Sequence, residues 1–80
     1  MTIKLDKATM QTFLLDGHPH ITLDNLLKCE GWCESGGVAK QMIAAGLVQV
    51  DGVVETRKRC KIIAGQVVKY EELEIRIIEE

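Results

Sequence analysis

The stretch ITLDNLLKCEGW (residues 21–32), followed closely by ESGGVAKQMIAAGLV (residues 34–48), decides the fold of this chain. In both stretches apolar residues recur three and four positions apart, which is the period of a helix with one buried face. Each stretch therefore predicts a short helix. Because only Cys33 separates the two stretches, the second helix is expected to follow the first after a brief connection.

Each predicted helix has residues that favour its start and its end. Thr22 and Ser35 carry side-chain oxygens of the kind that cap a helix N-terminus. Gly31 and Gly46 can adopt the left-handed conformation that closes a helix. The residues expected to face the core are Leu23, Leu26 and Leu27 in the first helix, and Val38, Met42, Ala45 and the adjacent Ile43 in the second.

The apolar period changes to that of a strand after the second helix. In LVQVDGVVE (residues 47–55) Val48 and Val50 alternate with polar residues, and the pair Asp51-Gly52 favours the two-residue turn of a β-hairpin. Further strands are predicted in TMQTFLL (residues 9–15), IIAGQVVKY (residues 62–70) and LEIRIIEE (residues 73–80), the last with Leu73, Ile75 and Ile77 facing inward. The predicted order is strand, helix, helix and three or four strands. This is an α+β domain in which two short helices pack on one face of a small, mainly antiparallel sheet.

Length and composition are those of an ordinary folded domain. The chain has 80 residues, enough for one domain over residues 1–80, and 46% of them are apolar and 28% charged. Residues 1–10 contain no continuous apolar segment, and nowhere do about 18 apolar residues follow one another to span a bilayer. The three cysteines are an odd number without framework spacing, which favours free thiols in a reducing compartment. We expect a cytoplasmic protein without a membrane partner.

Charge is distributed unevenly along the chain. The formal net charge is −2, yet ETRKRCKI (residues 55–62) contains four cations, Arg57, Lys58, Arg59 and Lys61. Residues 71–80, the predicted acidic C-terminal strand, contain five glutamates against Arg76 alone. A polyanion responds to the local field more than to the net charge of a protein. The acidic balance therefore does not exclude a nucleic-acid partner.

The cationic cluster suits an RNA backbone. Folded RNA hides most base edges, so proteins hold it mainly through phosphates, shape and 2′-hydroxyls. An Arg fork can bond two phosphate oxygens at once, and Lys adds a mobile point charge. If residues 57–61 are extended, Arg57, Arg59 and Lys61 point to one side, and Lys58 points to the other with Cys60. The alternative is a solvated loop that keeps the protein soluble, although cations this close repel one another unless a polyanion compensates them.

The start of the second helix, Ser35-Gly36-Gly37, is another candidate phosphate contact. A helix start leaves backbone N–H groups free, and two glycines let a phosphate approach the backbone closely. Two glycines also weaken a first helical turn, so another advantage is expected from them. Lys40, one turn along, could meet the same phosphate. The alternative is that these residues only cap the helix and form a tight corner.

LDNLLKCEGW (residues 23–32) followed by AKQMIAAGLVQVDG (residues 39–52) resembles the RNA-binding domain named after small-subunit ribosomal protein S4. That family also occurs in pseudouridine synthases, tyrosyl-tRNA synthetases and a ribosome-associated heat-shock protein. AGQVVKY (residues 64–70) resembles its closing strand, with Gln66 in the place of an Asp. LLKCEGWCESG (residues 26–36) and VDGVVETRKRCKI (residues 50–62) are similar to a stand-alone bacterial subgroup of about this length. The resemblance covers roughly residues 9–70.

The resemblance implies an αL-type RNA-binding fold that holds structured RNA, such as ribosomal or transfer RNA, on its helix pair and the following hairpin. It implies the ribosome or an RNA-modifying protein as further partners. Many family members have Arg where this chain has Thr22, Cys29 and Gly36, so we expect the cluster at residues 57–61 to take over part of the grip. The candidate RNA-binding residues are Lys28, Ser35, Gly36, Gly37, Lys40, Gln41, Arg57, Lys58, Arg59 and Lys61.

Two other binding interpretations are weaker. His18, His20, Cys29 and Cys33 supply four possible zinc ligands, but their order and spacing match no known zinc pattern, so we predict no metal and no cofactor. Trp32 and Tyr70 could stack on bases, but with only three aromatic residues in the chain we expect both to fill the core.

Catalysis is the remaining alternative. The cations around Cys60 would favour its thiolate, although alternation with Ile62 suggests that Cys60 is buried. No base occurs at an identifiable spacing from Cys60, and no Gly-rich nucleotide loop is present. We therefore predict a non-catalytic RNA-binding module without a small-molecule substrate. The alternative function is a protein-interaction adaptor whose basic loop docks an acidic partner.

Overall fold

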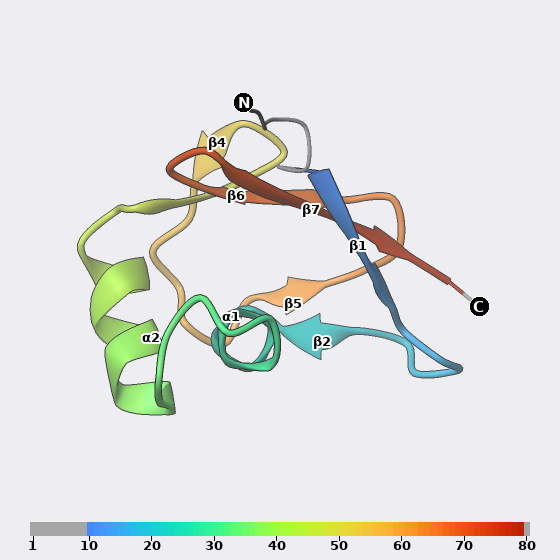
Figure 1. Ribbon diagram of the computed structural model, residues 1–80, viewed down its shortest axis with the longest axis horizontal. Helices are drawn as coiled ribbons and strands as arrows, with labels where there is room; N and C mark the ends of the chain where they lie inside the picture. Colours follow the sequence, from blue (N-terminus) through green and yellow to red (C-terminus); the bar gives the residue numbers. More distant parts are fainter. Residues whose placement is uncertain (1–9, 80) are drawn as a thin grey trace, which may run out of the picture.

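The computed structural model describes residues 10–79, so the predicted strand ends at Thr9 and Glu80 lie outside the described residues. The elements in chain order are β1 (Met10–Leu14), β2 (Ile21–Thr22), α1 (Leu23–Cys29), α2 (Gly36–Ala44), β3 (Val48–Val50), β4 (Val53–Val54), β5 (Lys61–Ile62), β6 (Val67–Tyr70) and β7 (Leu73–Ile78). Their arrangement is drawn in Figure 1.

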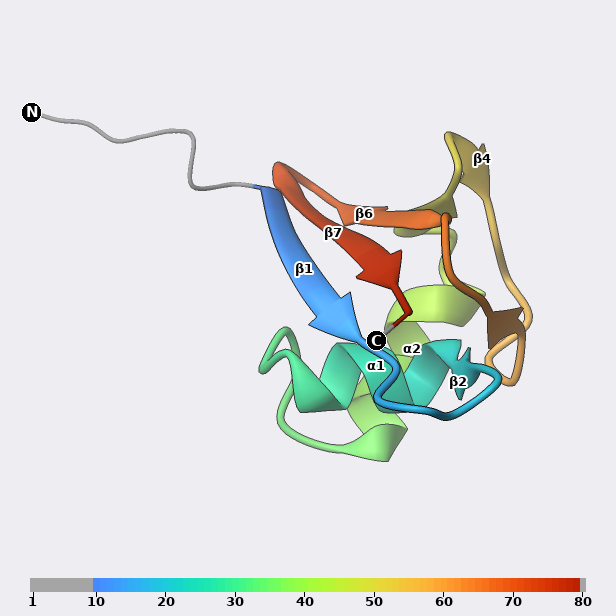
Figure 2. The same ribbon diagram turned by 90° about the vertical axis from the view of Figure 1, so that its right-hand side faces the viewer.

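Five strands form the main sheet, in the order β1-β7-β6-β3-β4. Neighbouring strands are antiparallel except β1 and β7, which are parallel. Both helices lie on one face of this sheet in the two views of Figures 1 and 2. The predicted α+β class is therefore confirmed, with two helices against a mainly antiparallel sheet.

Five strands follow the helices in the described residues, one more than the upper number predicted, because the segment predicted at residues 62–70 contributes to two strands, β5 and β6, with a turn at Ala64 and Gly65 between them. The additional strand is β5, which pairs with β2 in a separate antiparallel ladder that joins Ile21 to Ile62 and Thr22 to Lys61. Each of these strands has two residues, too few to show a period of their own. The ladder therefore exists because the two segments meet in space.

The glycines predicted to end the helices do so. Gly31 and Gly46 have φ values of 75° and 79°, in the left-handed region. Beyond α1, the N–H of Trp32 donates to the oxygen of Leu27, which is the backbone pattern of a glycine-closed helix end. At the start of α2, Ser35 Oγ accepts a hydrogen bond from the Val38 N–H at 3.4 Å, so Ser35 is a cap as predicted.

The β3–β4 hairpin turns at Asp51 and Gly52, as predicted. Their φ values are 53° and 83°, the pair of positive values that a primed two-residue turn requires. The Asp51 carboxylate also accepts a hydrogen bond of 2.9 Å from the N–H of Val67, the first residue of β6. The hairpin is thereby joined to the strand that continues the sheet.

The core lies between the helices and the sheet. Leu23, Leu26 and Leu27 of α1 are fully buried, as are Ile75 and Ile77 of β7, and all five were predicted to face inward. The other buried apolar residues are Leu15, Ala39, Met42, Ile43, Val48, Val50, Ile62 and Val68. Trp32 and Tyr70 pack against this cluster with ring centroids 6.3 Å apart, which agrees with the core-filling role predicted for both.

The buried face of α2 differs from the predicted one. Val38 is 39% exposed and Ala45 is also exposed, whereas Ala39 is completely buried beside Met42 and Ile43. Residues 39, 42 and 43 share one helical face by their spacing of three and four. The prediction was wrong about Val38 and Ala45 because α2 turns a neighbouring face toward the core. No helix among residues 10–79 has the length and apolar character needed to cross a membrane.

Candidate nucleic-acid interface

The cationic cluster lies in the segment that connects β4 to β5, residues 55–60, and in the first residue of β5, Lys61; we call residues 55–61 the basic loop. The segment is not extended. The N–H of Cys60 donates to the oxygen of Arg57 at 3.1 Å, so that the chain turns at Lys58 and Arg59. The alternation of side chains considered for an extended segment therefore does not apply. The four cations of the loop are nevertheless exposed: Arg57, Lys58, Arg59 and Lys61.

Contacts with the start of α1 explain why the basic loop turns. The N–H of Leu23 donates to the oxygen of Cys60 at 2.9 Å, and the N–H of Asp24 donates to the oxygen of Lys58 at 3.0 Å. The first N–H groups of a helix have no partner within the helix, and here the loop supplies the acceptors. The β2–β5 ladder then holds the end of the loop at Lys61. Backbone carbonyls of the loop thus face the helix, and the cationic side chains remain in solvent.

The same contacts explain why the Thr22 side chain does not cap α1. Thr22 precedes α1, but its side chain makes no capping hydrogen bond, and its buried Oγ1 has no partner among residues 10–79. A capping oxygen would accept from the N–H of Asp24 or Asn25. The first of these donates to Lys58, and the second to Oδ1 of Asp24 at 2.8 Å. The prediction of a Thr22 cap was wrong because both donors already have acceptors.

Glu55 organises the first half of the basic loop. Its carboxylate accepts hydrogen bonds from Arg57 Nε at 2.9 Å, from Arg57 Nη2 at 3.0 Å and from the Arg57 N–H at 2.9 Å. The Glu55 side chain is 15% exposed, and that of Arg57 is 76% exposed. The hydrogen bonds from Arg57 lower the pKa of Glu55 to about 2, and the same pairing raises the pKa of Arg57. Glu55 is therefore ionised at neutral pH and fixes the direction of Arg57.

This ion pair changes the charge balance of the cluster. The carboxylate of Glu55 compensates one of the four cations, so mutual repulsion is weaker than the sequence suggested. Lys58, Arg59 and Lys61 make no ion pair with another residue in the range 10–79. Three cations of the loop consequently face solvent without a compensating carboxylate from the described chain. Glu55 was not among the predicted site residues, although its position two residues before Arg57 was a visible signal.

An open depression of about 480 Å³ lies over the basic loop, lined by Arg57, Arg59, Cys60 and Lys61. Cys60 is half-buried, and Arg57 Nη2 lies 3.8 Å from its Sγ. Burial, followed by the nearby Glu55 carboxylate, raises the pKa of the Cys60 thiol. The nearby Arg57 lowers this pKa, as expected of a cation, but desolvation and the Glu55 carboxylate outweigh its effect. The depression is thus a cationic surface beside a protonated thiol.

The other candidate residues lie on the helix pair. Lys28 is in the last turn of α1, at the opposite end from the basic loop, and Lys40 and Gln41 are exposed on α2. Gly36 and Lys40 are four residues apart on α2, as are Gly37 and Gln41, so each pair shares one side of the helix. In Figure 2 the basic loop descends along one edge of the molecule beside β5, whereas α2 begins below α1. The predicted RNA-binding residues therefore form two groups, one on the basic loop and one on the helix pair.

Space is open around the two glycines at the start of α2. A Cβ atom added to Gly36 would meet nothing within 4 Å, and one added to Gly37 would meet only Ser35 Oγ at 3.8 Å. Neither glycine has a φ value in the left-handed region. The fold could accommodate alanine at both positions, so packing does not explain the glycines. A close approach by a ligand to the backbone stays a prediction.

The histidines and cysteines considered above as zinc ligands do not form a cluster in the described residues. Residues 10–79 contain no group of three or more His, Cys, Asp or Glu side chains arranged to hold a metal ion. Cys29 is exposed, Cys33 is half-buried, and both are free thiols. His18 and His20 lie instead in the connection between β1 and β2, beside a small cavity.

Comparison with known proteins agrees with this architecture. The sequence profile of the S4 domain matches residues 13–78, which is most of the chain. This chain belongs to the S4 domain family. It is 56% identical over 69 residues to the "Putative RNA-binding protein YbcJ" of Escherichia coli, covering 86% of this chain and 99% of that protein. Its identity to the "Uncharacterized protein YbcJ" of Shigella flexneri is the same over the same length.

The fold of this S4-domain protein is also that of a solved relative. The solution structure of YbcJ from Escherichia coli superimposes with a TM-score of 0.67 and 46% sequence identity, covering 98% of this chain and 96% of that one. That structure is described as containing an αL motif involved in RNA binding. The resemblance to the S4 family and to its stand-alone bacterial subgroup is therefore confirmed.

Proposed function

We propose that this S4-domain protein binds structured RNA through phosphate contacts and shape, with the basic loop as its main grip. One observation carries the proposal. Lys58, Arg59 and Lys61 are exposed and unpaired within the described residues, on a loop whose carbonyls are hydrogen-bonded to the start of α1. Cations held at fixed positions lose less conformational freedom on binding a phosphate backbone than cations on a mobile segment. The names of the relatives also refer to RNA binding.

The start of α2 is the proposed second contact. Ser35, Gly36 and Gly37 leave backbone N–H groups and open space at a helix N-terminus, which favours an anion. Lys40 and Gln41 lie one turn further along the same helix, and Lys28 lies at the end of α1. Because these residues are at the other end of α1 from the basic loop, one folded RNA would have to span the helix pair.

We infer further that the protein acts without catalysis, in the cytoplasm, on ribosomal or transfer RNA, alone or with the ribosome or an RNA-modifying protein. Three observations support parts of this inference. The thiol of Cys60 has a raised pKa, which disfavours a nucleophilic role. The three cysteines are free, as in a reducing compartment. The S4 family profile covers residues 13–78, and a relative 56% identical to this chain is named for RNA binding rather than for catalysis.

A protein partner is the second candidate. Val53 and Val54 of β4 are 69% and 50% exposed, just before the basic loop. An acidic protein with an apolar surface could cover both features at once. The two candidates differ in their response to salt, because releasing counterions from RNA gives a steep linear fall of log affinity with log salt concentration. Docking of a protein should depend less on salt and should persist in excess RNA.

The test is fluorescence anisotropy with labelled structured RNA over a salt series, for the wild type, Arg59→Glu and Arg76→Glu. Both arginines are exposed, and Arg76 lies on β7, outside the proposed interface, so the two variants match in charge. If Arg59 contacts a phosphate, Arg59→Glu should lower affinity about tenfold and reduce the salt slope by about 1, with a smaller effect from Arg76→Glu. Equal losses in both variants would mean that only net charge matters, and absence of RNA binding at low salt would contradict the proposed function.

A further inference from the structure

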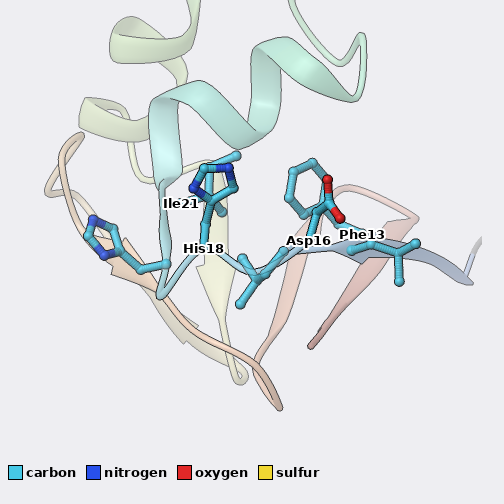
Figure 3. A pocket seen from close by; sticks show the side chains of 7 residues that line it. Phe13, Asp16, His18 and Ile21 are labelled. Atoms are coloured by element: carbon cyan, nitrogen blue, oxygen red, sulfur yellow. The ribbon is translucent and has the colours of Figure 1, made fainter. Parts of the chain in front are cut away.

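A second cavity, of about 230 Å³, lies in the connection between β1 and β2, outside both proposed contacts. Its lining includes Phe13 from the end of β1 and Ile21 from β2, with Leu15, Asp16, His18 and His20 from the segment between the two strands. Figure 3 shows Phe13, Asp16 and His18 on the same side of this segment, toward α1. The cavity thus combines apolar, aromatic and polar groups from one short stretch of chain.

The size and lining of the cavity indicate the kind of ligand it can hold. Pockets for drug-sized ligands occupy about 300–1,000 Å³, so this smaller cavity suits a single planar ring system. Leu15 is almost fully buried, and Phe13 and Ile21 pack against the core, which gives an apolar floor. Aromatic and imidazole rings are the side chains on which unpaired bases stack in RNA-binding proteins.

The turn beneath the cavity fixes its polar side. Asp16 and Gly17 have φ values of 56° and 86°, both in the left-handed region, and the N–H of His18 donates to the oxygen of Leu15 at 3.1 Å. The turn therefore holds Asp16 and His18 close to the apolar residues that precede and follow it. A carboxylate at this position disfavours phosphate and favours a group that donates hydrogen bonds, such as the amino group of a base.

The cavity adjoins the basic loop through the β2–β5 ladder. Ile21, which lines the cavity, pairs with Ile62, and Ile62 directly follows Lys61 of the cationic depression. An RNA strand whose phosphates lie against Lys61 and Arg59 would therefore have neighbouring nucleotides within reach of the cavity. This continuity favours part of the same RNA over an unrelated small molecule as the occupant.

We propose that the cavity between β1 and β2 binds one unpaired nucleobase of the bound RNA, and that it prefers bases with an exocyclic amino group. The base lies on the apolar floor against Phe13 or the imidazole of His18, and the Asp16 carboxylate accepts a hydrogen bond from its amino group. Adenine, cytosine and guanine carry such a group, whereas uracil does not. This inference rests on the proposed RNA-binding function and adds a preference for particular bases.

The experiment follows backbone amide signals by NMR during titration with AMP, CMP, GMP and UMP separately, and then with a stem–loop RNA. We expect saturable shifts in residues 13–21 that are larger for AMP, CMP and GMP than for UMP. Asp16→Asn removes the charge but tolerates the left-handed turn, because Asn adopts this conformation readily. This variant should weaken binding of the amino-bearing nucleotides about fivefold. Glu72→Gln makes the same charge change at an exposed site in the β6–β7 turn and should leave the shifts unchanged.

The outcomes separate this inference from the proposed function. If the stem–loop RNA shifts the basic loop while residues 13–21 remain unshifted with every ligand, the nucleobase site is wrong and RNA binding stands. Equal shifts with all four nucleotides, unaffected by Asp16→Asn, would overturn the preference for an amino group and with it the role of Asp16. If neither nucleotides nor RNA shift any amide, the proposed function itself fails.

Discussion

The basic loop and the start of α2 carry most of the proposed RNA contacts, but different kinds of contact determine their conformations. At α2 the decisive hydrogen bond joins Ser35 to Val38, three residues apart. In the basic loop the decisive bonds join Lys58 and Cys60 to Asp24 and Leu23, about 35 positions earlier in the chain. The sequence predicted the first conformation correctly and left the second open. Local sequence signals therefore predict the conformation of a segment only where its hydrogen-bond partners are close to it in the sequence.

The largest effect should come from breaking the long-range support of the loop. Ile62 of β5 is fully buried and pairs with Ile21, whereas Ile63 is 52% exposed. Ile62→Ala should lower the free energy of unfolding by about 2–5 kcal/mol, because it removes a buried side chain and leaves a cavity. Ile63→Ala should change it by less than about 1 kcal/mol. Urea denaturation of both variants measures the difference, and equal losses would contradict burial of Ile62 as the source of the effect.

The Glu55–Arg57 pair provides a sharper test of loop organisation. Glu55→Gln makes the protein less acidic, so electrostatics alone predicts tighter RNA binding. If the carboxylate is needed to orient Arg57, the variant should instead bind RNA about threefold to tenfold more weakly, at a cost of about 1 kcal/mol. Glu72→Gln has the same charge change without a contact to the loop and serves as the control. Anisotropy titrations at fixed salt concentration show whether Glu55→Gln binds RNA more tightly or more weakly than the wild type.

The same pair should make a modest contribution to acid stability. The pKa of Glu55 is lowered from its usual 4.5 to about 2 in the folded protein, so ionised Glu55 favours folding above pH 4.5. That contribution should disappear as pH falls from about 4.5 to 2. The stability difference between the wild type and Glu55→Gln should therefore shrink over this range, as measured by urea denaturation at several pH values. A difference that is independent of pH would contradict ionisation as its cause.

The smallest effect should come from the start of α2. Gly36→Ala should stabilise the protein by up to about 1 kcal/mol, because alanine favours a helix and the added Cβ meets nothing within 4 Å. If a phosphate contacts the backbone there, the same variant should bind RNA a few times more weakly. Greater stability combined with weaker binding separates a ligand contact from simple capping. Unchanged RNA affinity would leave Gly36 outside the interface.

Periodicity and turn chemistry predicted much of the fold because these signals are local. The burial of Leu23, Leu26 and Leu27, the Asp51-Gly52 turn and the glycine that ends each helix all depend on residues within a few positions of one another. The two-residue β2–β5 ladder was not predictable in this way, because neither strand is long enough to show alternation. Because the ladder was absent from the predicted fold, the sequence did not show that the chain turns within residues 57–61.

For the candidate sites, the sequence by itself determined which charges are available and that Arg57, Lys58, Arg59 and Lys61 stand together. Only the tertiary structure decided how they are presented. Free N–H groups at the start of α1 required acceptors, the loop carbonyls supplied them, and this interaction turned the backbone inward and left the cations in solvent. It also raised the pKa of the Cys60 thiol, because the burial of Cys60 and its position beside Glu55 depend on that turn.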